Sequence, residues 1–268
     1  MSKTLPAAPR SLDGIAILVT RPEEQARGLI AEIARLGGQP VFAPMIVIQG
    51  RLDAPEVRQK VRQVADYQIV VFVSRNAADF GVQLMAQERQ GLAHCTVYAV
   101  GAGSGSQLAS LGVTKVVVPA TDFTSEGLLK LPGLASAQVA GKRVLIVRGV
   151  GGRELLAQKL KQRGAEVDYC EVYARSAPVA PLSGILAANR VTVPDLALIT
   201  SLESITNLAA QIDAEQLERL YDMPLVVAGA RTALEVERLG FTRKPVVVDH
   251  PGDTNLIEAI EHWANDEQ

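Results

Sequence analysis

Polar and arginine side chains come directly after the apolar runs of this chain. The runs are short and continuous, which is typical of strands buried on both faces of a parallel sheet. Because the carboxyl ends of parallel strands share one edge with helix N-termini, the groups that follow them are candidates for binding an anion. These candidates are Arg21, Ser74, Arg75, Asn76, Gly101, Ser104, Arg148, Arg153, Ser201, Ser204 and Thr232.

Each of these loops also has a simpler interpretation, because Ser, Thr and Asn are favoured N-caps of helices in any protein. The arginines beside them favour a shared cleft for an anionic ligand. Arg148 and Arg153 enclose a glycine-rich turn (149–152) that follows an expected strand at 144–147. Backbone N–H groups are unpaired at a helix start, so an anion is stabilised at such a turn. The alternative for both arginines is an ordinary surface position.

The run GAGSGS at 101–106 invites comparison with a dinucleotide-binding loop. Ser106 stands where the fingerprint G-x-G-x-x-G needs glycine, and the run does not open a nucleotide-binding unit. The sequence has no P-loop and no G-x-S-x-G motif, and its three histidines, His94, His250 and His262, are scattered. The pattern predicts an anion-binding cleft that works without a metal or a cofactor.

Strand and helix patterns alternate along the chain, which predicts parallel sheets flanked by helices. Pro44 interrupts the run at 41–48 and removes a hydrogen-bond donor, so that run should be an edge strand or a crossing segment. We expect a helix from Ala77 to Gln87, and GAGSGS should precede the helix after it. Strands are expected at 15–20, 41–48, 69–73, 96–100, 116–118, 144–147, 167–173, 196–200, 225–228 and 246–248.

The chain contains an internal repeat at a spacing of about half its length. Glycines and serines at the expected ends of strands and helices recur at this spacing. Gly38, Ser74 and Gly101 correspond to Gly164, Ser201 and Gly229. A period this long is too large for a solenoid and indicates a duplicated domain. The predicted fold class is α/β, with two similar domains that each hold a parallel sheet flanked by helices.

Composition argues against several other classes of protein. Of the 268 residues, 48% are hydrophobic, so the chain has ample material for a core. A net charge of −2 argues against a general binder of nucleic acid or of anionic membranes. No apolar run has the length of a membrane helix, and the N-terminus lacks the apolar segment of a signal peptide. Cys95 and Cys170 lack metal-ligand spacing, which favours buried, reduced thiols in a cytoplasmic protein.

With these residues in view, the chain resembles the uroporphyrinogen-III synthase family. No single motif is specific, but their order and spacing together are, and the match covers nearly the whole chain from Ile17 onward. The matching motifs are ILVTRP (17–22), FVSRNA (72–77), AVGAGS (99–104), TSEGLL (124–129), VLIVRGVGGRE (144–154), GAEVDYCEVYAR (164–175), ITSLESITNL (199–208) and VAGARTALEVERLG (227–240).

The resemblance implies a particular domain organisation. The first α/β domain is discontinuous, because the N-terminal strand and helix pack with the C-terminal third of the chain. It should comprise residues 1–45 and 178–268, and the second domain residues 52–167. The segments 46–51 and 168–177 should then form a two-stranded linker between the domains.

The resemblance also implies a reaction without cofactor or metal. The substrate would be hydroxymethylbilane, a linear tetrapyrrole with eight carboxylates, which loses water, inverts its last pyrrole through a spiro intermediate and closes to uroporphyrinogen III. Tyr173 matches the family's tyrosine, proposed to assist departure of the hydroxyl group, and a phenol is a suitable proton donor. Its alternative is a packing role in a linker strand. Ser74, Ser201 and Thr232 match positions that line the family's cleft.

The chain departs from the family's motifs at three positions. Ser104 stands where threonine is common, Gly105 replaces the usual alanine, and Val73 removes one hydroxyl from the element that reads FVS here. The first two changes keep the hydroxyl group or the small size. Arg148 and Arg153 as carboxylate partners are our own inference and are not carried over from the family.

A second class of function competes with the enzyme. The same features suit a non-catalytic, two-domain clamp that binds an anionic metabolite. We expect a monomer with a small-molecule substrate, hydroxymethylbilane, and no nucleic-acid or membrane partner. The identity of the product formed from hydroxymethylbilane separates the two hypotheses.

Overall fold

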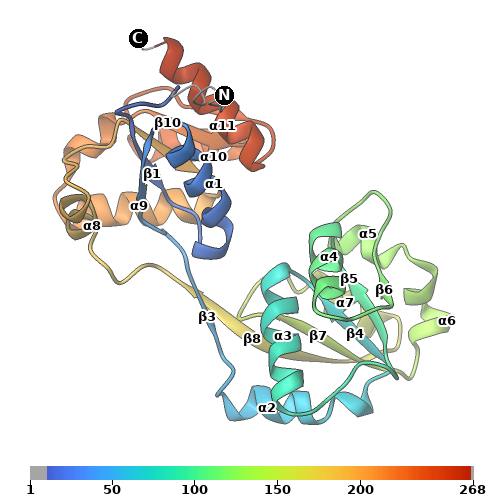
Figure 1. Cartoon of the computed structure of the whole chain (residues 1–268). Coiled ribbons are helices and arrows are strands. Elements are labelled where there is room, and N and C mark those ends of the chain that lie inside the picture. The colour runs from blue at the N-terminus through green and yellow to red at the C-terminus, as the bar shows by residue number, and fades with distance from the viewer. Residues whose placement is uncertain (1–10, 267–268) are drawn as a thin grey trace, which may run out of the picture. The chain divides into compact units, whose positions relative to one another are not determined.

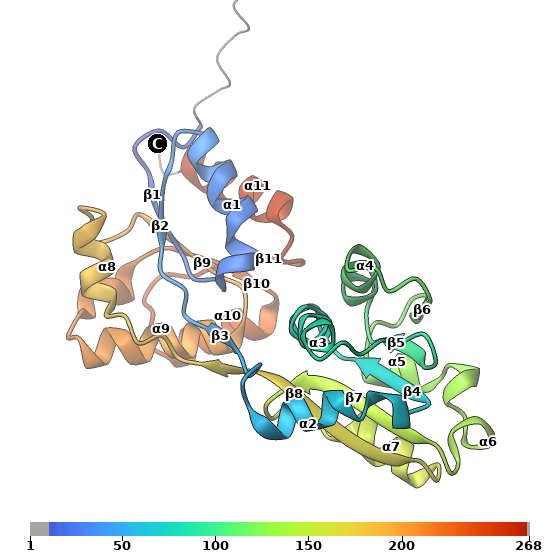
Figure 2. The ribbon, with the colours of Figure 1, turned by 60° about the horizontal axis from the view of Figure 1, so that its bottom comes forward.

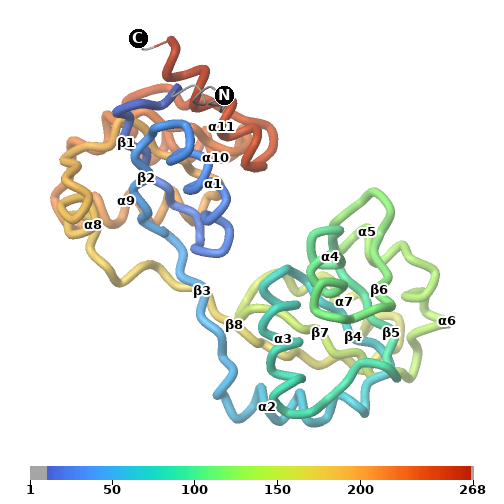
Figure 3. Tube along the Cα trace, viewed as in Figure 1, coloured from blue at the N-terminus to red at the C-terminus, as the bar shows by residue number. Residues whose placement is uncertain are grey.

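The computed structural model of the chain describes residues 11–266 and divides them into two compact units. One unit holds the described residues up to Val47 together with those from Ser176 onward. The other holds Ile48–Arg175. Figure 3 traces this division, since the blue start and the orange to red end of the chain meet in one unit while the segment between them builds the other. The first unit is therefore assembled from two separate pieces of sequence.

The first unit contains a parallel five-stranded sheet in the order β11-β10-β9-β1-β2 (Figure 1). Its strands are β1 (Ala16–Val19), β2 (Gln39–Phe42), β9 (Leu196–Ile199), β10 (Leu225–Ala228) and β11 (Val246–Val248). Its helices are α1 (Glu23–Arg35), α8 (Leu182–Ala188), α9 (Leu202–Ala214), the 3-10 helix η3 (Glu218–Asp222), α10 (Ala230–Arg238) and α11 (Asp253–Asp266). The pairing of β1 with β9 joins the two pieces of sequence at the centre of the sheet.

Side chains of β1 alternate between the two faces of this sheet, as expected for a strand. Ile17 packs in a cluster with apolar residues of α1 and α11, whereas Leu18 packs with those of α8, α9 and α10. Figure 2 shows α1 beside α11 and, apart from them, α8 beside α9. Both faces of the sheet are thus covered, which explains the continuous apolar runs of its strands.

The second unit contains a six-stranded sheet in the order β3-β8-β7-β4-β5-β6. Its strands are β3 (Val47–Gly50), β4 (Ile69–Phe72), β5 (Thr96–Ala99), β6 (Val116–Val117), β7 (Arg143–Gly149) and β8 (Glu166–Ser176). Its helices are α2 (Pro55–Arg62), η1 (Val64–Asp66), α3 (Arg75–Gln87), α4 (Ala102–Ser110), α5 (Ser125–Leu129), η2 (Pro132–Leu134), α6 (Ser136–Val139) and α7 (Leu155–Gln162). The pairs from β8 to β6 are parallel, with α2, α3 and α4 over one face and α5, α6 and α7 over the other.

Parallel sheets flanked by helices are confirmed, and several boundaries differ from the prediction. The run expected at 41–48 is two strands, β2 and β3, because the chain leaves the first sheet around Pro44. Helix α3 starts at Arg75, since Ser74 rather than a later residue caps it. Most of GAGSGS lies inside α4, where Gly105 lets the helix approach Val118: a Cβ at Gly105 would lie 2.7 Å from the Val118 side chain.

Strand β8 extends well beyond the expected end of the second domain at 167. It pairs with β7 as far as Tyr173, so much of the segment expected as linker is a regular part of this sheet. Strand β3 lies on its other side, where the Arg51 N–H donates to the Val172 carbonyl at 2.8 Å. Helices α6 and α8 and the 3-10 turns are not expected from the sequence. No helix within residues 11–266 has the length and apolar character needed to cross a membrane.

Candidate active site

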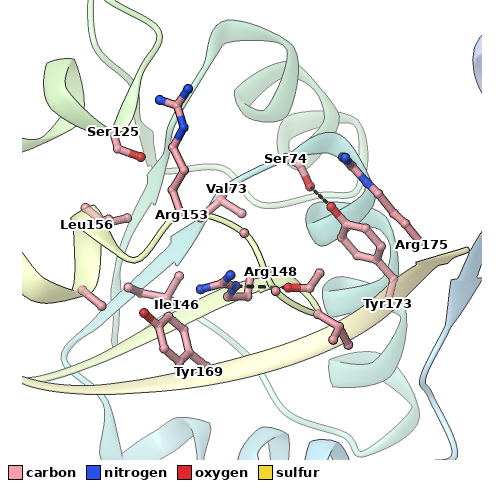
Figure 4. Close-up of a pocket in the computed structure, with 15 residues that line it drawn as sticks. Val73, Ser74, Ser125, Ile146, Arg148, Arg153, Leu156, Tyr169, Tyr173 and Arg175 are labelled. Atoms are coloured by element: carbon pink, nitrogen blue, oxygen red, sulfur yellow. Dashed lines mark hydrogen bonds between the residues drawn. The ribbon is translucent and has the colours of Figure 1, made fainter. Parts of the chain in front are cut away.

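A cavity of about 260 Å³ lies in the second unit at the carboxyl ends of β4, β7 and β8 (Figure 4). This is the edge of the sheet at which α/β proteins bind ligands. Of the residues predicted from the sequence, Ser74, Arg148, Arg153 and Tyr173 line the cavity. The structure thus brings the predicted catalytic tyrosine together with three predicted binding residues.

Tyr173 is held against the end of β7 with its hydroxyl group directed at a helix start. The residue is 3% exposed, and its Oη lies 3.1 Å from Ser74 Oγ. Ser74 is the N-cap of α3, and its Oγ accepts a hydrogen bond from the Ala77 N–H at 3.1 Å. A Cβ at Gly149 would lie 2.6 Å from the Tyr173 ring, so glycine is needed for this contact. The hydroxyl group is therefore positioned by packing as well as by a hydrogen bond.

An irregularity in the pairing of β7 and β8 sets the direction of Tyr173. The register shifts between Arg148 and Gly149, which pair with Glu171 and Tyr173, so one extra residue lies in β8. Such bulges often redirect side chains near ligand sites. Tyr173 belongs to the core cluster on the α3 side of the sheet, whereas Tyr169 packs on the α7 side. Both nevertheless line the cavity.

Arg148 is a buried arginine with a carboxylate partner. The residue is 4% exposed, and its Nη1 donates to Glu154 Oε1 at 3.0 Å while Nε donates to the Gly149 carbonyl at 3.1 Å. The guanidinium carbon lies 4.6 Å from the centroid of the Tyr169 ring. The Tyr169 hydroxyl donates to the other oxygen of Glu154. Arg148, Glu154 and Tyr169, which we name the site triad, are therefore mutually connected.

The site triad perturbs the pKa values of its members. The hydrogen bond from Tyr169, together with the Arg148 charge, holds the pKa of Glu154 below its ordinary value against the opposing effect of burial. Burial and the Glu154 carboxylate raise the pKa of Tyr169 to about 12. At neutral pH the triad therefore consists of a cation, an anion and a neutral phenol.

The rim of the cavity carries further arginines. Arg153 has a side chain that is 77% exposed, and its Nη1 lies 4.0 Å from Glu126 Oε1. Arg175, at the end of β8, also lines the cavity, and Figure 4 shows it beside Tyr173. The structure gives Arg153 more solvent access than Arg148, so the two predicted carboxylate partners are in different electrostatic environments.

The other predicted residues of this unit lie outside the cavity lining. Arg75 and Asn76 begin α3, and the Arg75 guanidinium lies over Gly103, where a Cβ would be 2.7 Å from Nε. Gly101 is the N-cap of α4. Ser104 is 7% exposed inside that helix, which leaves it little surface for a ligand.

The predicted residues of the first unit have partners within the chain. Arg21 is 5% exposed, its Nη1 lies 2.6 Å from Asp253 Oδ1, and its Nη2 donates to the Pro251 carbonyl. Ser201 caps α9 and its Oγ lies 2.9 Å from the Oγ of Ser204, which is 1% exposed. These contacts hold loops together.

Thr232 lies within α10 and is 5% exposed. It shares this burial with Arg21 and Ser204, so only Ser201 of the four predicted residues in the first unit is partly exposed.

Sequence reasoning missed Glu154, Tyr169, Arg175 and Ser125, which line the cavity or bond to its lining. All four lie within the motifs VLIVRGVGGRE, GAEVDYCEVYAR and TSEGLL. The sequence offered one signal for Tyr169, because it lies in the same expected strand as Tyr173. Within residues 11–266, no group of three or more His, Cys, Asp and Glu side chains is arranged to hold a metal ion.

Together, the parallel sheets, the cavity at strand carboxyl ends and its arginine-bearing rim define the class of the protein: an α/β protein whose site suits a small anionic molecule. Comparison with known proteins gives the family. The family model described as "Uroporphyrinogen-III synthase HemD" matches residues 28–258. The chain therefore belongs to the uroporphyrinogen-III synthase family, as its motifs suggested.

Two relatives match this chain over almost their entire length. The uroporphyrinogen-III synthase of Escherichia coli is 30% identical over 251 residues, covering 92% of this chain and all of the relative. That of Synechococcus elongatus is 25% identical over 265 residues, covering 96% and 98%.

Two solved structures share the fold at 16% sequence identity. A mutant uroporphyrinogen III synthase from Thermus thermophilus aligns with a TM-score of 0.60, covering 95% of this chain and all of that chain. The Helicobacter pylori uroporphyrinogen-III synthetase aligns with a TM-score of 0.58 and the same coverage.

Proposed function

We propose that the chain catalyses the reaction after which its family is named. It cyclises hydroxymethylbilane with loss of water and inversion of ring D, giving uroporphyrinogen III, and is thus a lyase. Loss of water and ring closure balance without any electron donor, so the reaction as written needs no cofactor. The full-length relationship to the Escherichia coli synthase supports this function over that of a non-catalytic clamp.

The observation that carries the proposal is the placement of the Tyr173 hydroxyl. It lies 3.1 Å from Ser74 Oγ at the start of α3, in a cavity with arginines on its rim. A phenol within hydrogen-bond reach of the departing hydroxyl group of the substrate can assist its loss. The resulting azafulvene cation is reactive, so the remaining task is to orient the chain ends for closure.

In this proposal, the exposed members of the predicted set bind substrate carboxylates directly, whereas the buried members shape the surrounding loops. Arg153 and Arg75 are exposed and suit direct ion pairs. The buried members, Arg21 and Ser204 among them, shape the loops whose backbone N–H groups face the ligand. The further residues of the proposed site are Ser74, Asn76, Gly101, Ser104, Ser201 and Thr232.

The proposal includes the domain organisation and its origin by duplication. Two domains comprise residues 1–45 with 178–268 and residues 52–167, joined by linker strands at 46–51 and 168–177. The strand order supports the duplication: β2-β1-β9-β10-β11 in one sheet corresponds position by position to β8-β7-β4-β5-β6 in the other. Corresponding strands are about half a chain apart, which is the spacing of the sequence repeat.

The proposed enzyme acts as a monomer in the cytoplasm. Cys95 and Cys170 are unpaired thiols, as is usual in a reducing compartment. Light scattering of the purified protein would test the monomer.

The decisive experiment supplies purified protein with hydroxymethylbilane and resolves the isomers formed. The expected product is uroporphyrinogen III, with an unchanged rate after dialysis against a chelator. Formation of the symmetric isomer alone would refute the enzyme and favour the clamp.

The role of Tyr173 is tested by removing its hydroxyl group. Tyr173→Phe should lower kcat by about tenfold to hundredfold, because the loss of a proton donor slows departure of the leaving group. It should be more harmful than Ser74→Ala, and neither change should abolish activity. Full rate in Tyr173→Phe together with large loss in Ser74→Ala would contradict this role.

A further inference from the structure

The geometry of Arg148 leaves one nitrogen of a buried guanidinium for a ligand. Nε donates to the Gly149 carbonyl and Nη1 to Glu154. Nη2 lies beside Gly152, and it donates to no carboxylate or carbonyl among the described residues. The Tyr169 hydroxyl is the other polar group within reach of the guanidinium. Arg148 and Gly152 both line the cavity, which places Nη2 at its wall.

We infer that Glu154 and Tyr169 are positioning residues, which hold Arg148 so that its Nη2 binds one carboxylate of the substrate. The inference rests on the proposed function and adds to it a defined carboxylate subsite. Neither residue contacts the reacting atoms in this scheme, and both act through Arg148.

Burial makes this positioning necessary. An arginine side chain has many rotamers, and fixing one of them costs conformational entropy. A buried cation without a partner is also strongly destabilised. Glu154 offsets both costs, because one carboxylate oxygen accepts from Arg148 while the other accepts from Tyr169. The Tyr169 ring lies against the guanidinium at 4.6 Å and limits its rotation.

Gly152 leaves the space in which the carboxylate would lie. A Cβ at this position would be 2.9 Å from Arg148 Nη2, and the residue has a φ of +95°. A side chain here would occupy the approach to the uncommitted nitrogen. The glycine-rich turn thus keeps Nη2 open, and Arg153 on the same turn adds an exposed positive charge.

The charge of Glu154 is set by the groups that face it from each neighbouring element. Arg148 lies on β7, Tyr169 on β8 and Lys161 on α7. Arg153 precedes it in the chain. The hydrogen bond from Tyr169 is the largest cause of its lowered pKa. Loss of that hydroxyl group should therefore raise the pKa of Glu154, so the carboxylate would accept a proton at higher pH.

The same unit contains a matched control. At the other end of β7, the Arg143 guanidinium lies 4.6 Å from the Tyr67 ring centroid, and the Tyr67 hydroxyl donates to Asp168 at 2.8 Å. We name Arg143, Tyr67 and Asp168 the far triad. It lies outside the cavity lining, so changes in it report structural effects alone.

The test compares Tyr169→Phe and Glu154→Gln with Tyr67→Phe in the full-length enzyme. Tyr169→Phe removes one oxygen atom and keeps the ring under Arg148. We expect KM for hydroxymethylbilane to rise about fivefold to tenfold in both site variants, with kcat within about twofold, because uniform binding is lost. KM should be unchanged in Tyr67→Phe.

The pH profile separates positioning from a merely structural role. In Tyr169→Phe, the acid limb of kcat/KM should move to higher pH than in wild type, since Glu154 loses the hydrogen bond that keeps it ionised. Unchanged KM in both site variants, or an equal rise in Tyr67→Phe, would overturn the inference. If wild type itself forms no uroporphyrinogen III, the proposed function fails instead.

Discussion

Strand β7 has an arginine near each end, each grouped with a tyrosine and a carboxylate from other segments, and these two groups differ in their surroundings. In both, the guanidinium carbon lies 4.6 Å from a tyrosine ring whose hydroxyl group donates to the carboxylate. In the far triad, Lys60 adds a second cation 2.7 Å from Asp168, and Tyr67 is fully buried. The site triad borders a cavity and has an uncommitted nitrogen on Arg148.

The comparison teaches that position along the strand, rather than residue type, separates a structural cluster from a ligand-binding one. Arg143, in the far triad, is the first residue of β7, at the edge of the sheet where helices end. Arg148, in the site triad, lies near the carboxyl end of β7, at the edge of the sheet where α3 starts at Arg75 and α7 at Leu155. Asp168 and Tyr169 are adjacent in β8, so their side chains point to opposite faces of the sheet. Helix starts carry unpaired N–H groups and a partial positive charge, so an anion is stabilised beside only one of the two triads.

The largest expected difference between the triads is in catalysis after loss of the arginine. Arg148→Met should lower kcat/KM by about tenfold to hundredfold, because a charge-assisted hydrogen bond to the substrate is lost. Arg143→Met should change kcat/KM by less than about twofold, since surface ion pairs contribute little and the residue is distant from the cavity. Steady-state kinetics measures both. An equal loss of kcat/KM in the two variants would show that the two triads do not differ in function.

Two adjacent glycines sharpen the assignment of the Arg148 subsite. Gly151 and Gly152 both have positive φ, +74° and +95°, so alanine strains the backbone at either position. Only at Gly152 does an added Cβ approach Arg148 Nη2; at Gly151 it meets nothing within 4 Å. We expect Gly152→Ala to raise KM about fivefold more than Gly151→Ala does.

Thermal unfolding of both glycine variants provides the control. Their melting temperatures should fall by similar amounts, because the backbone strain is common to both. If KM rose equally in the two variants, the rise would reflect their common loss of stability, and the proposed subsite at Arg148 would be wrong.

The central strands of both sheets, among them β1, β4 and β9, were predictable because they are buried on two faces and therefore read as continuous apolar runs. Ser74 and Tyr173 were predictable as site residues because they stand where such runs end or where a family motif recurs. Glu154 was not, because an isolated glutamate after a glycine turn is indistinguishable in sequence from a solvated charge. Its importance depends on Arg148 being buried, and burial of an arginine is a tertiary property.

Tertiary context also explains why some helices and strands differ from those expected from the sequence. GAGSGS has the composition of a turn, yet two of its three glycines lie in α4, where Gly103 contacts the Arg75 side chain and Gly105 the Val118 side chain. Close packing, which no local pattern encodes, decides the conformation there. The length of β8 likewise depends on its pairing with β7, which continues past a bulge to Tyr173.

Stability should respond to the triads in the opposite order from catalysis. Tyr67→Phe should lower the free energy of unfolding by about 1–1.5 kcal/mol, because a fully buried hydroxyl group loses its bond to Asp168. Tyr169→Phe should cost less, since its hydroxyl bonds to a carboxylate that is half exposed. Urea denaturation of the two variants measures the difference. A larger loss in Tyr169→Phe would show that the far triad is not the structural one.

The smallest expected effect is the dependence of stability on acid. Burial opposes ionisation of Asp168, but hydrogen bonds from Lys60 and Tyr67 outweigh it and hold its pKa below the ordinary value of 3.8. A carboxylate with a lowered pKa contributes stability above its ordinary pKa and loses that contribution as pH falls through the folded-state pKa. Wild type should therefore be more stable than Asp168→Asn at pH 6, and the difference should shrink as the pH approaches 3.

Glu154→Gln should show the same trend with a smaller amplitude. Its pKa is lowered chiefly by the Tyr169 hydrogen bond, but the carboxylate is half exposed and water screens its interactions. Urea denaturation at pH 6, 4.5 and 3.5 would measure both differences. If the wild-type advantage over Asp168→Asn stayed constant down to pH 3.5, ionisation of Asp168 would not stabilise the far triad. If the dependence for Glu154→Gln were the steeper, the carboxylate at the site would be the structural one, and the functions assigned to the two triads would have to be exchanged.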